Sequence, residues 1–294
     1  MNWGEAFALA SALGWAWAVI LLRRSGESLP PFELNLFKNV FGFVLLIPTI
    51  LIVNGFVWPV YSLFDLFVVL VSGVLGIAVA DTWYLRALNL MGASRTGIVA
   101  SLFSPFVILL STIFLGERMV LWQWLGFSLV IFGVLLVTWR VHRSEVDADD
   151  LKKGSLYGVG AMFMMAIGIV MVKEILETRP FLWTVELRMV GGIAGMLVVM
   201  MFGGRWRRAK QSFTKPQPWG TVIGASFLAA YVALILWLAG YKLIDASVAS
   251  ALNETNGAFI VLLAWLMLGE KMSRRKLAGV SLTLAGVIIM VSMK

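Results

Sequence analysis

The sequence predicts an all-α polytopic membrane protein with ten transmembrane helices, arranged as two inverted repeats of five helices. First, 60% of the 294 residues are hydrophobic and only 14% are charged, too few to cover the surface of a soluble domain of this size. Second, apolar stretches of about 18 to 25 residues recur along the whole chain, each long enough to cross a hydrocarbon core of ~30 Å. Third, the two halves match each other in sequence.

The expected spans are separated mostly by short connections, so consecutive helices are predicted to be antiparallel. The longest polar breaks lie at residues 140–153 and 205–217. In chain order, the expected spans are Trp3–Leu22, Phe32–Val53, Phe64–Leu88, Ala93–Leu115, Leu121–Val141, Gly154–Ile175, Phe181–Phe202, Trp219–Leu243, Ala246–Leu268 and Lys276–Met293.

The formal net charge of +8 comes from Lys and Arg residues that gather in the loops after the odd-numbered spans. Basic loops mark the cytoplasmic side of a membrane protein, so we expect a multi-pass protein of the cell (inner or plasma) membrane with both termini on the non-cytoplasmic side. Because the charges are spread over short loops and form no basic amphipathic element, nucleic acid is not an expected partner.

Neither a metal nor a cofactor is expected. The chain has no cysteine, which excludes disulfides and thiolate metal sites, and its single histidine, His142, lies in the most polar stretch. The sequence has no HExxH motif and no Gly-rich P-loop ending in Lys-Ser or Lys-Thr. We therefore expect neither a membrane-embedded enzyme nor an ATP-driven pump.

The repeat is clearest where residues 92–119 align without gaps on residues 245–272, and both segments close on Leu-Gly-Glu, a basic residue and Met. Upstream, residues 29–42 match residues 179–192, and this alignment pairs Lys38 with Arg188.

Five spans per repeat is an odd number, so the second half must be inverted in the membrane relative to the first. We expect repeats at residues 1–141 and 154–294, joined by a polar linker loop at 142–153, with a midplane site between them. The fifth and tenth spans have no deep charge. Their glycines recur at seven-residue spacing (Gly126 and Gly133, Gly279 and Gly286), which predicts a packing seam outside the central cavity.

Several motifs resemble the EamA family of the drug/metabolite transporter superfamily across nearly the whole chain. They are a Trp-containing first helix ending in basic residues ("ALGWAWAVILLRR"), Pro followed by a basic residue early in the second and seventh helices, "YLRALNLMGAS" echoed by "WLAGYKLIDAS", and "FLGERM" with "MLGEKM". The resemblance implies ten helices in two five-helix repeats. It also implies transport of amino acids, other small metabolites or organic cations, often as export and by proton coupling or exchange.

Ionisable residues deep in a bilayer are costly and are functional candidates by default. Asp81 and Glu254 are the candidates for proton coupling, while Lys38, Glu186 and Arg188 are candidates for binding substrate. The alternative is structural ion pairing, in which Lys38 neutralises Asp81, and Arg188 neutralises Glu186 or Glu254.

A polar cluster interrupts the ninth span, where Asn253, Glu254 and Asn256 lie beside Gly257. Three polar groups within four positions favour a binding site, although hydrogen bonding between helices, worth about 1 kcal/mol or less per contact, is the alternative. In the first repeat Pro105 is expected to bend the fourth helix and free the carbonyl of Ser101.

Aromatic side chains within the spans supply the other walls of a possible pocket, and packing is the alternative role for each of them. Trp15 is the first choice because it is central and flanked by Gly14. The residues predicted to bind substrate are Trp15, Trp17, Lys38, Asp81, Trp83, Tyr84, Glu186, Arg188, Tyr231, Trp237, Asn253, Glu254 and Asn256.

These features predict a secondary active transporter, an exporter by preference, for a small polar metabolite. Aromatic walls with carboxylates suit an amine or organic cation through cation–π contacts, and carboxylates with basic partners equally suit a zwitterionic amino acid. The expected partners are a small-molecule substrate and the lipid bilayer, with the chain a monomer or homodimer. The alternative is a channel-like or lipid-translocating protein of the same fold.

Overall fold

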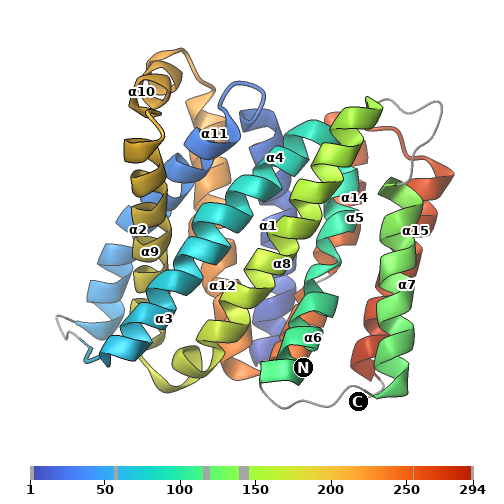
Figure 1. Cartoon of the computed structure of the whole chain (residues 1–294), viewed down its shortest axis with the longest axis horizontal. Coiled ribbons are helices and arrows are strands. Elements are labelled where there is room, and N and C mark those ends of the chain that lie inside the picture. The colour runs from blue at the N-terminus through green and yellow to red at the C-terminus, as the bar shows by residue number, and fades with distance from the viewer. Residues whose placement is uncertain (1–2, 56–58, 115–119, 139–145, 254, 293–294) are drawn as a thin grey trace.

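The structure, a computed structural model, describes residues 3–55, 59–114, 120–138, 146–253 and 255–292 as a helical bundle (Figure 1), and this part of the chain contains no strand. Seven helical stretches are long and apolar enough to cross a membrane. Two shorter apolar helices, Trp124–Leu136 and Thr255–Leu268, accompany them. The prediction of an all-α chain with many apolar spans is confirmed for the described residues.

The helices follow the predicted spans closely. The first half contains α1 (Trp3–Ser25), α2 (Pro31–Asn54), α3 (Leu63–Gly73), η1 (Val74–Asp81), α4 (Thr82–Met91), α5 (Ala93–Ala100), α6 (Phe103–Phe114) and α7 (Leu121–Thr138). The second half contains α8 (Ala148–Thr178), α9 (Phe181–Phe202), α10 (Trp206–Thr214), α11 (Trp219–Phe227), η2 (Leu228–Val232), α12 (Ala233–Leu243), α13 (Ala246–Asn253), α14 (Thr255–Leu268) and α15 (Arg274–Ser292).

Each half has a π-helical segment in its third expected span. The segment η1 joins α3 to α4, and η2 joins α11 to α12. When the gap-free alignment is extended upstream, η2 falls inside the stretch that matches η1. The sequence predicted plain helices at Phe64–Leu88 and Trp219–Leu243, because hydropathy does not distinguish a π turn from an α turn. Such segments are rare and occur frequently at functional sites.

The predicted bend in the fourth span is confirmed as a break between α5 and α6. The backbone N–H groups of Ser101 and Leu102 donate to carbonyls three residues back, at 3.2 and 3.1 Å. Pro105 lies in the first turn of α6 and has no N–H to donate to the Ser101 carbonyl, so the α-helical hydrogen bonds are interrupted between α5 and α6. In the ninth span, α13 ends at Asn253 and α14 begins at Thr255, while Glu254 lies outside the described residues.

Two segments predicted as polar breaks contain helix instead. Helix α8 begins at Ala148, inside the expected 142–153 loop, because the Asp147 carboxylate accepts a hydrogen bond from the Asp149 N–H (3.0 Å) and caps the helix. Helix α10 lies within the expected 205–217 break, at the end of the bundle opposite the marked N and C ends (Figure 1). Its Ala209 is buried against Phe32 and Met196, so an apolar contact holds this basic helix on the bundle.

The predicted glycine seam between the fifth and tenth spans is confirmed, and α7 and α15 form a pair at one edge of the bundle (Figure 1). A Cβ at Gly286 would lie 2.6 Å from the Gly126 carbonyl oxygen, and one at Gly133 would lie 2.9 Å from the Gly279 carbonyl oxygen. The backbones therefore touch directly at both crossings. The pairing is reciprocal, since Gly126 aligns with Gly279 and Gly133 with Gly286.

Glu270 ties the end of the second half to the start of α5. Its carboxylate accepts hydrogen bonds from the backbone N–H groups of Ala93 (2.7 Å) and Ser94 (3.2 Å) and pairs with Lys276 at 3.1 Å. Gly92, at φ +82°, starts the turn that presents these N–H groups. Partial burial acts to raise the pKa of Glu270, but the hydrogen bond from Ser94, the Lys276 charge and the hydrogen bond from Ala93 outweigh it and lower that pKa.

Replacing Glu270 by Gln should lower the stability of the protein by about 1–3 kcal/mol at neutral pH, because charge-assisted hydrogen bonds to backbone donors are weakened. A lowered pKa stabilises the folded state above the ordinary Glu pKa of about 4.3, and this contribution is lost as the pH falls through the folded value. Thermal unfolding in detergent from pH 7 down to about pH 3 should therefore show a gap between wild type and Glu270→Gln that is constant above about pH 4.3 and closes below it.

Glu174→Gln is the matched control, since Glu174 is an exposed glutamate on α8. A gap of the same size for this control, or a Glu270→Gln gap that does not change with pH, would show that the carboxylate contributes nothing special at α5.

Candidate functional site

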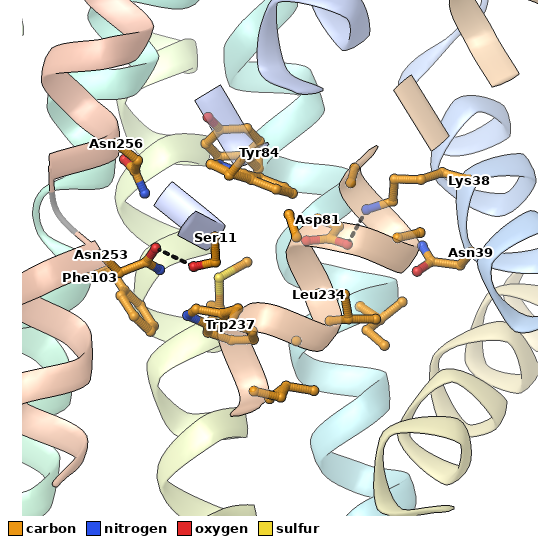
Figure 2. Close-up of a pocket in the computed structure, with 18 of the residues that line it drawn as sticks. Ser11, Lys38, Asn39, Asp81, Tyr84, Phe103, Leu234, Trp237, Asn253 and Asn256 are labelled. Atoms are coloured by element: carbon orange, nitrogen blue, oxygen red, sulfur yellow. Dashed lines mark hydrogen bonds and ion pairs between the residues drawn. The ribbon is translucent and has the colours of Figure 1, made fainter. Parts of the chain in front are cut away.

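A cavity of about 100 Å³ lies between the two halves of the bundle. Residues from α1, α2, η1, α4, α8, α9, η2 and α12, and from both broken spans, line it (Figure 2). Its wall combines many apolar side chains with polar side chains that come from several helices. Among the described residues, no group of three or more His, Cys, Asp or Glu is placed to hold a metal ion.

The lining positions of the two halves correspond through the sequence repeat. When the gap-free alignment of the halves is extended upstream, matched positions of both repeats meet at the cavity. The matched lining positions are Gly76 with Ala229, Ile77 with Ala230, Asp81 with Leu234, Tyr84 with Trp237, Ala100 with Asn253, and Phe103 with Asn256; the upstream match adds Lys38 with Arg188. One scaffold thus presents two different sets of side chains to the same space.

Lys38 and Asp81 form a buried ion pair at the cavity wall, with Lys38 Nζ 2.5 Å from Asp81 Oδ2. The Lys38 side chain is 3% exposed, so each charge depends on the other for compensation. The pairing that the sequence left as an alternative is therefore present in this conformation. It joins α2 to the end of η1, and both residues still face the cavity (Figure 2).

Asn35 and Asn39 hold the same corner together, and sequence reasoning missed both. Asn35 Nδ2 donates to the Ile77 carbonyl of η1 (2.7 Å) and to Thr82 Oγ1 (3.0 Å). Asn39 Nδ2 donates to Asn35 Oδ1 at 2.8 Å and lines the cavity itself. Within a membrane, backbone groups in irregular helix need such side-chain partners. The sequence did contain a signal for this contact, because Asn35 and Asn39 are two amides spaced four residues apart, and so on one face, in an apolar helix.

Arg188 of α9 lines the cavity and is 2% exposed, yet its Nε and Nη1 atoms have no hydrogen-bond partner among the described residues. Gly76 leaves room for the guanidinium, because a Cβ there would lie 3.1 Å from Nη2. The proposed pairing with Glu186 is not formed: both carboxylate oxygens of Glu186 are buried without a partner in the described part of the chain, and Glu186 does not line the cavity. The two residues point apart because positions two apart on a helix differ by about 200°.

The polar cluster of the ninth span reaches the cavity through Asn253 and Asn256. Ser11 of α1, which sequence reasoning missed, donates its hydroxyl hydrogen to Asn253 Oδ1 at 3.0 Å (Figure 2). The Oδ1 atom of Asn256 is buried without a hydrogen-bond partner in the described structure. The cluster therefore offers one satisfied and one available amide.

Aromatic rings form two opposite parts of the wall. Trp15 lies against Tyr84 with ring centroids 5.8 Å apart, and Trp237 lies against Phe103 at 6.0 Å. All four line the cavity, so the choice of Trp15 as the leading aromatic agrees with the geometry. Phe103 was not a candidate, because in the sequence it looks like any other apolar residue of its span.

Three predicted aromatic residues lie away from the cavity. Trp17 is 41% exposed on the outer face of α1, since it is two positions from Trp15. Trp83 packs on Tyr157 at 6.3 Å between ring centroids, because α8 covers its side of α4. Tyr231 bonds its hydroxyl to Thr49 Oγ1 at 2.5 Å, as η2 turns it toward α2. The sequence analysis placed these residues within the apolar spans but did not determine which face of each helix they occupy.

Replacing Asp81 by Leu, the residue that the second half has at the matched position, should destabilise the protein by about 3–5 kcal/mol, because Lys38 is left as an unpaired buried cation. Removing both charges with Lys38→Met and Asp81→Leu should recover most of this loss. Unfolding of the three variants in detergent, compared as a double-mutant cycle, measures the coupling. Additive losses in the double variant would show that the pair is not coupled.

The chain is similar in sequence to known transporters and in fold to a solved structure. A transporter of Archaeoglobus fulgidus described as uncharacterized is 20% identical over 282 residues, covering 96% of this chain and 95% of that protein. The UDP-N-acetylglucosamine transporter of Rattus norvegicus is 29% identical over 105 residues, and the match spans only about a third of each protein, 33% of this chain and 32% of that one. A solved crystal structure shares the fold, with a TM-score of 0.69 at 18% identity over 99% of this chain and 96% of that one.

The profile of the EamA-like transporter family matches residues 2–139 and again residues 152–292, so nearly the whole chain is covered in two parts. Its apolar helices make it a transmembrane protein, and its family and relatives are transporters. The chain belongs to the EamA-like transporter family.

Proposed function

We propose that this protein is a secondary active transporter, an exporter by preference, that moves a small polar metabolite by alternating access. The observation that carries this proposal is the cavity between the halves, lined at matched positions of both repeats. A volume of about 100 Å³ is below the roughly 300–1,000 Å³ of sites for drug-sized ligands, which favours a small solute such as an amino acid or an amine.

The proposed scaffold has ten transmembrane helices as two inverted repeats, residues 1–141 and 154–294. Reciprocal packing supports it: α1 packs on α12 while the matched helix α8 packs on α4, and the glycine contacts between α7 and α15 are reciprocal too. Contacts that exchange between matched elements are what a two-fold relation between the halves produces. A two-fold axis in the membrane plane gives inverted repeats and lets each half take the other's conformation.

We place the protein in the cell membrane with both termini on the non-cytoplasmic side. Support comes from α10 and its basic residues, which lie at the end of the bundle opposite the marked chain ends (Figure 1). The substrate-binding set proposed here keeps the predicted residues that line the cavity, and Glu254, which lies outside the described residues, stays a candidate from the sequence alone. Those lining residues are Trp15, Lys38, Asp81, Tyr84, Arg188, Trp237, Asn253 and Asn256.

In proteoliposomes, saturable uptake that is stimulated by substrate on the opposite side should identify the protein as a carrier. Trp15→Ala should weaken apparent affinity about fivefold or more, because an aromatic contact is worth about 1 kcal/mol. Trp17→Ala is the matched control: it removes the same side chain two positions away, on the exposed face of α1. Non-saturable flux would favour a channel, and equal effects of the two variants would return Trp15 to a packing role.

Proton coupling is proposed to use Asp81 or Glu254. Neutralising the coupling carboxylate with Asp81→Asn or Glu254→Gln should abolish net flux driven by a pH gradient while sparing substrate exchange, which needs no net proton movement. Flux measured with and without the gradient, beside exchange of labelled substrate, separates the two steps. Gradient-driven flux that persists in both variants would rule out both carboxylates as the proton site.

A further inference from the structure

The two cations of the cavity occupy matched positions, but their surroundings differ in one respect. Lys38 is paired with Asp81, which lies at the end of η1. Arg188 is the counterpart of Lys38, and the counterpart of Asp81 is Leu234. The second half therefore repeats the cation of the first half and replaces its carboxylate by an alkyl side chain. Asp81 and Leu234 both line the cavity (Figure 2).

Arg188 is consequently a buried guanidinium with free donors. Its Nε and Nη1 atoms have no partner among the described residues, and it is 2% exposed. The Oδ2 atom of Asp81, the acidic residue among the described lining residues, is held by Lys38 at 2.5 Å. Among the described lining residues, the formal charges of Lys38, Asp81 and Arg188 leave one positive charge uncompensated.

A buried cation is stable when an anion of matching geometry compensates it. The guanidinium presents its N–H donors in a rigid fork that fits a carboxylate with two parallel hydrogen bonds. The rest of the cavity suits the remainder of a small metabolite: Trp15 and Trp237 give apolar surface, and Asn256 Oδ1 is a free acceptor. Among the described lining residues, a solute that carries only positive charge would meet an uncompensated cation instead.

We propose that Arg188 binds the carboxylate of the transported solute, so that the substrates are small carboxylate-bearing metabolites, amino acids among them, and organic cations without a carboxylate are excluded. This inference rests on the transport function proposed above and narrows it. Leu234 is its specificity-determining counterpart, because a carboxylate at that position would occupy Arg188 as Asp81 occupies Lys38. The absence of that carboxylate is what keeps the guanidinium available to a ligand.

The test uses the full chain, purified for thermal-shift binding and reconstituted for counterflow. The probes are the common amino acids, each beside its amide and its decarboxylated amine, which keep the side chain and lose the anion. Only the carboxylate-bearing member of each set should bind and be exchanged. Arg188→Gln should weaken that binding about 10- to 100-fold, the loss expected for charge-assisted hydrogen bonds, and Arg188→Lys should weaken it less.

Leu234→Asp supplies the decisive variant, with Leu234→Asn as the uncharged control of the same shape. The aspartate should compete with the solute carboxylate for Arg188 and reduce binding at least tenfold more than the asparagine does. Because these two variants alter neither Arg188 nor the Lys38–Asp81 pair, they also serve if Arg188 variants fail to fold.

Three results would overturn the inference: amides and amines binding as tightly as acids, unchanged affinity in Arg188→Gln, or equal losses in Leu234→Asp and Leu234→Asn. In each of these, counterflow by the wild type would still uphold the carrier function. A wild type that exchanges no probe at all would count against both the carrier function and its carboxylate substrate.

Discussion

Compensation of buried charge is the constraint on which this bundle depends. A cation within hydrocarbon is tolerated only beside an anion, a ring of acceptors or a water-filled space. Lys38 meets this requirement by pairing with Asp81. That contact needs α2 and η1 to lie together, and Asn35 of α2 holds them by donating a hydrogen bond to the Ile77 carbonyl of η1. Arg188 differs, because its Nε and Nη1 atoms have no hydrogen-bond partner among the described residues and its side chain lines the cavity.

The two halves share features of their helical framework but differ in side chains that line the cavity. Features that hold the helices together recur in both halves, such as the glycines of the seam between α7 and α15 and the π segments in the third spans. Several side chains that face the cavity differ between the halves: Asp81 is matched by Leu234, and Phe103 by Asn256. The frame is therefore close to symmetric while its lining is not, and an asymmetric lining gives a bound solute one preferred orientation.

Much of this could be read from the sequence, because span length, charge depth and the repeat depend on one-dimensional patterns. Lys38, Asp81, Trp15 and Asn253 were found in this way, and all line the cavity. A one-dimensional pattern does not show which residue of another helix a given side chain contacts. Whether Asp81 is free or paired is decided by Lys38 on α2, and the sequence pattern alone left both possibilities open.

The sequence analysis also did not determine which face of its helix each aromatic residue occupies. Trp17 is exposed and does not line the cavity, and its two-residue spacing from Trp15 already argued against both side chains facing inward. Tyr231 could not be placed by such reasoning at all, because it lies in η2, where the angle per residue departs from that of an α-helix.

The π segments also have a mechanical meaning. A π turn is closed by a hydrogen bond between residues five apart, whereas an α turn joins residues four apart. Each third span therefore holds one extra residue in a turn beside the cavity. Passing between the two kinds of turn changes the length of a span by one rise, about 1.5 Å, while its carbonyls keep partners throughout. Each third span can therefore change its length beside the cavity without a break in the helix.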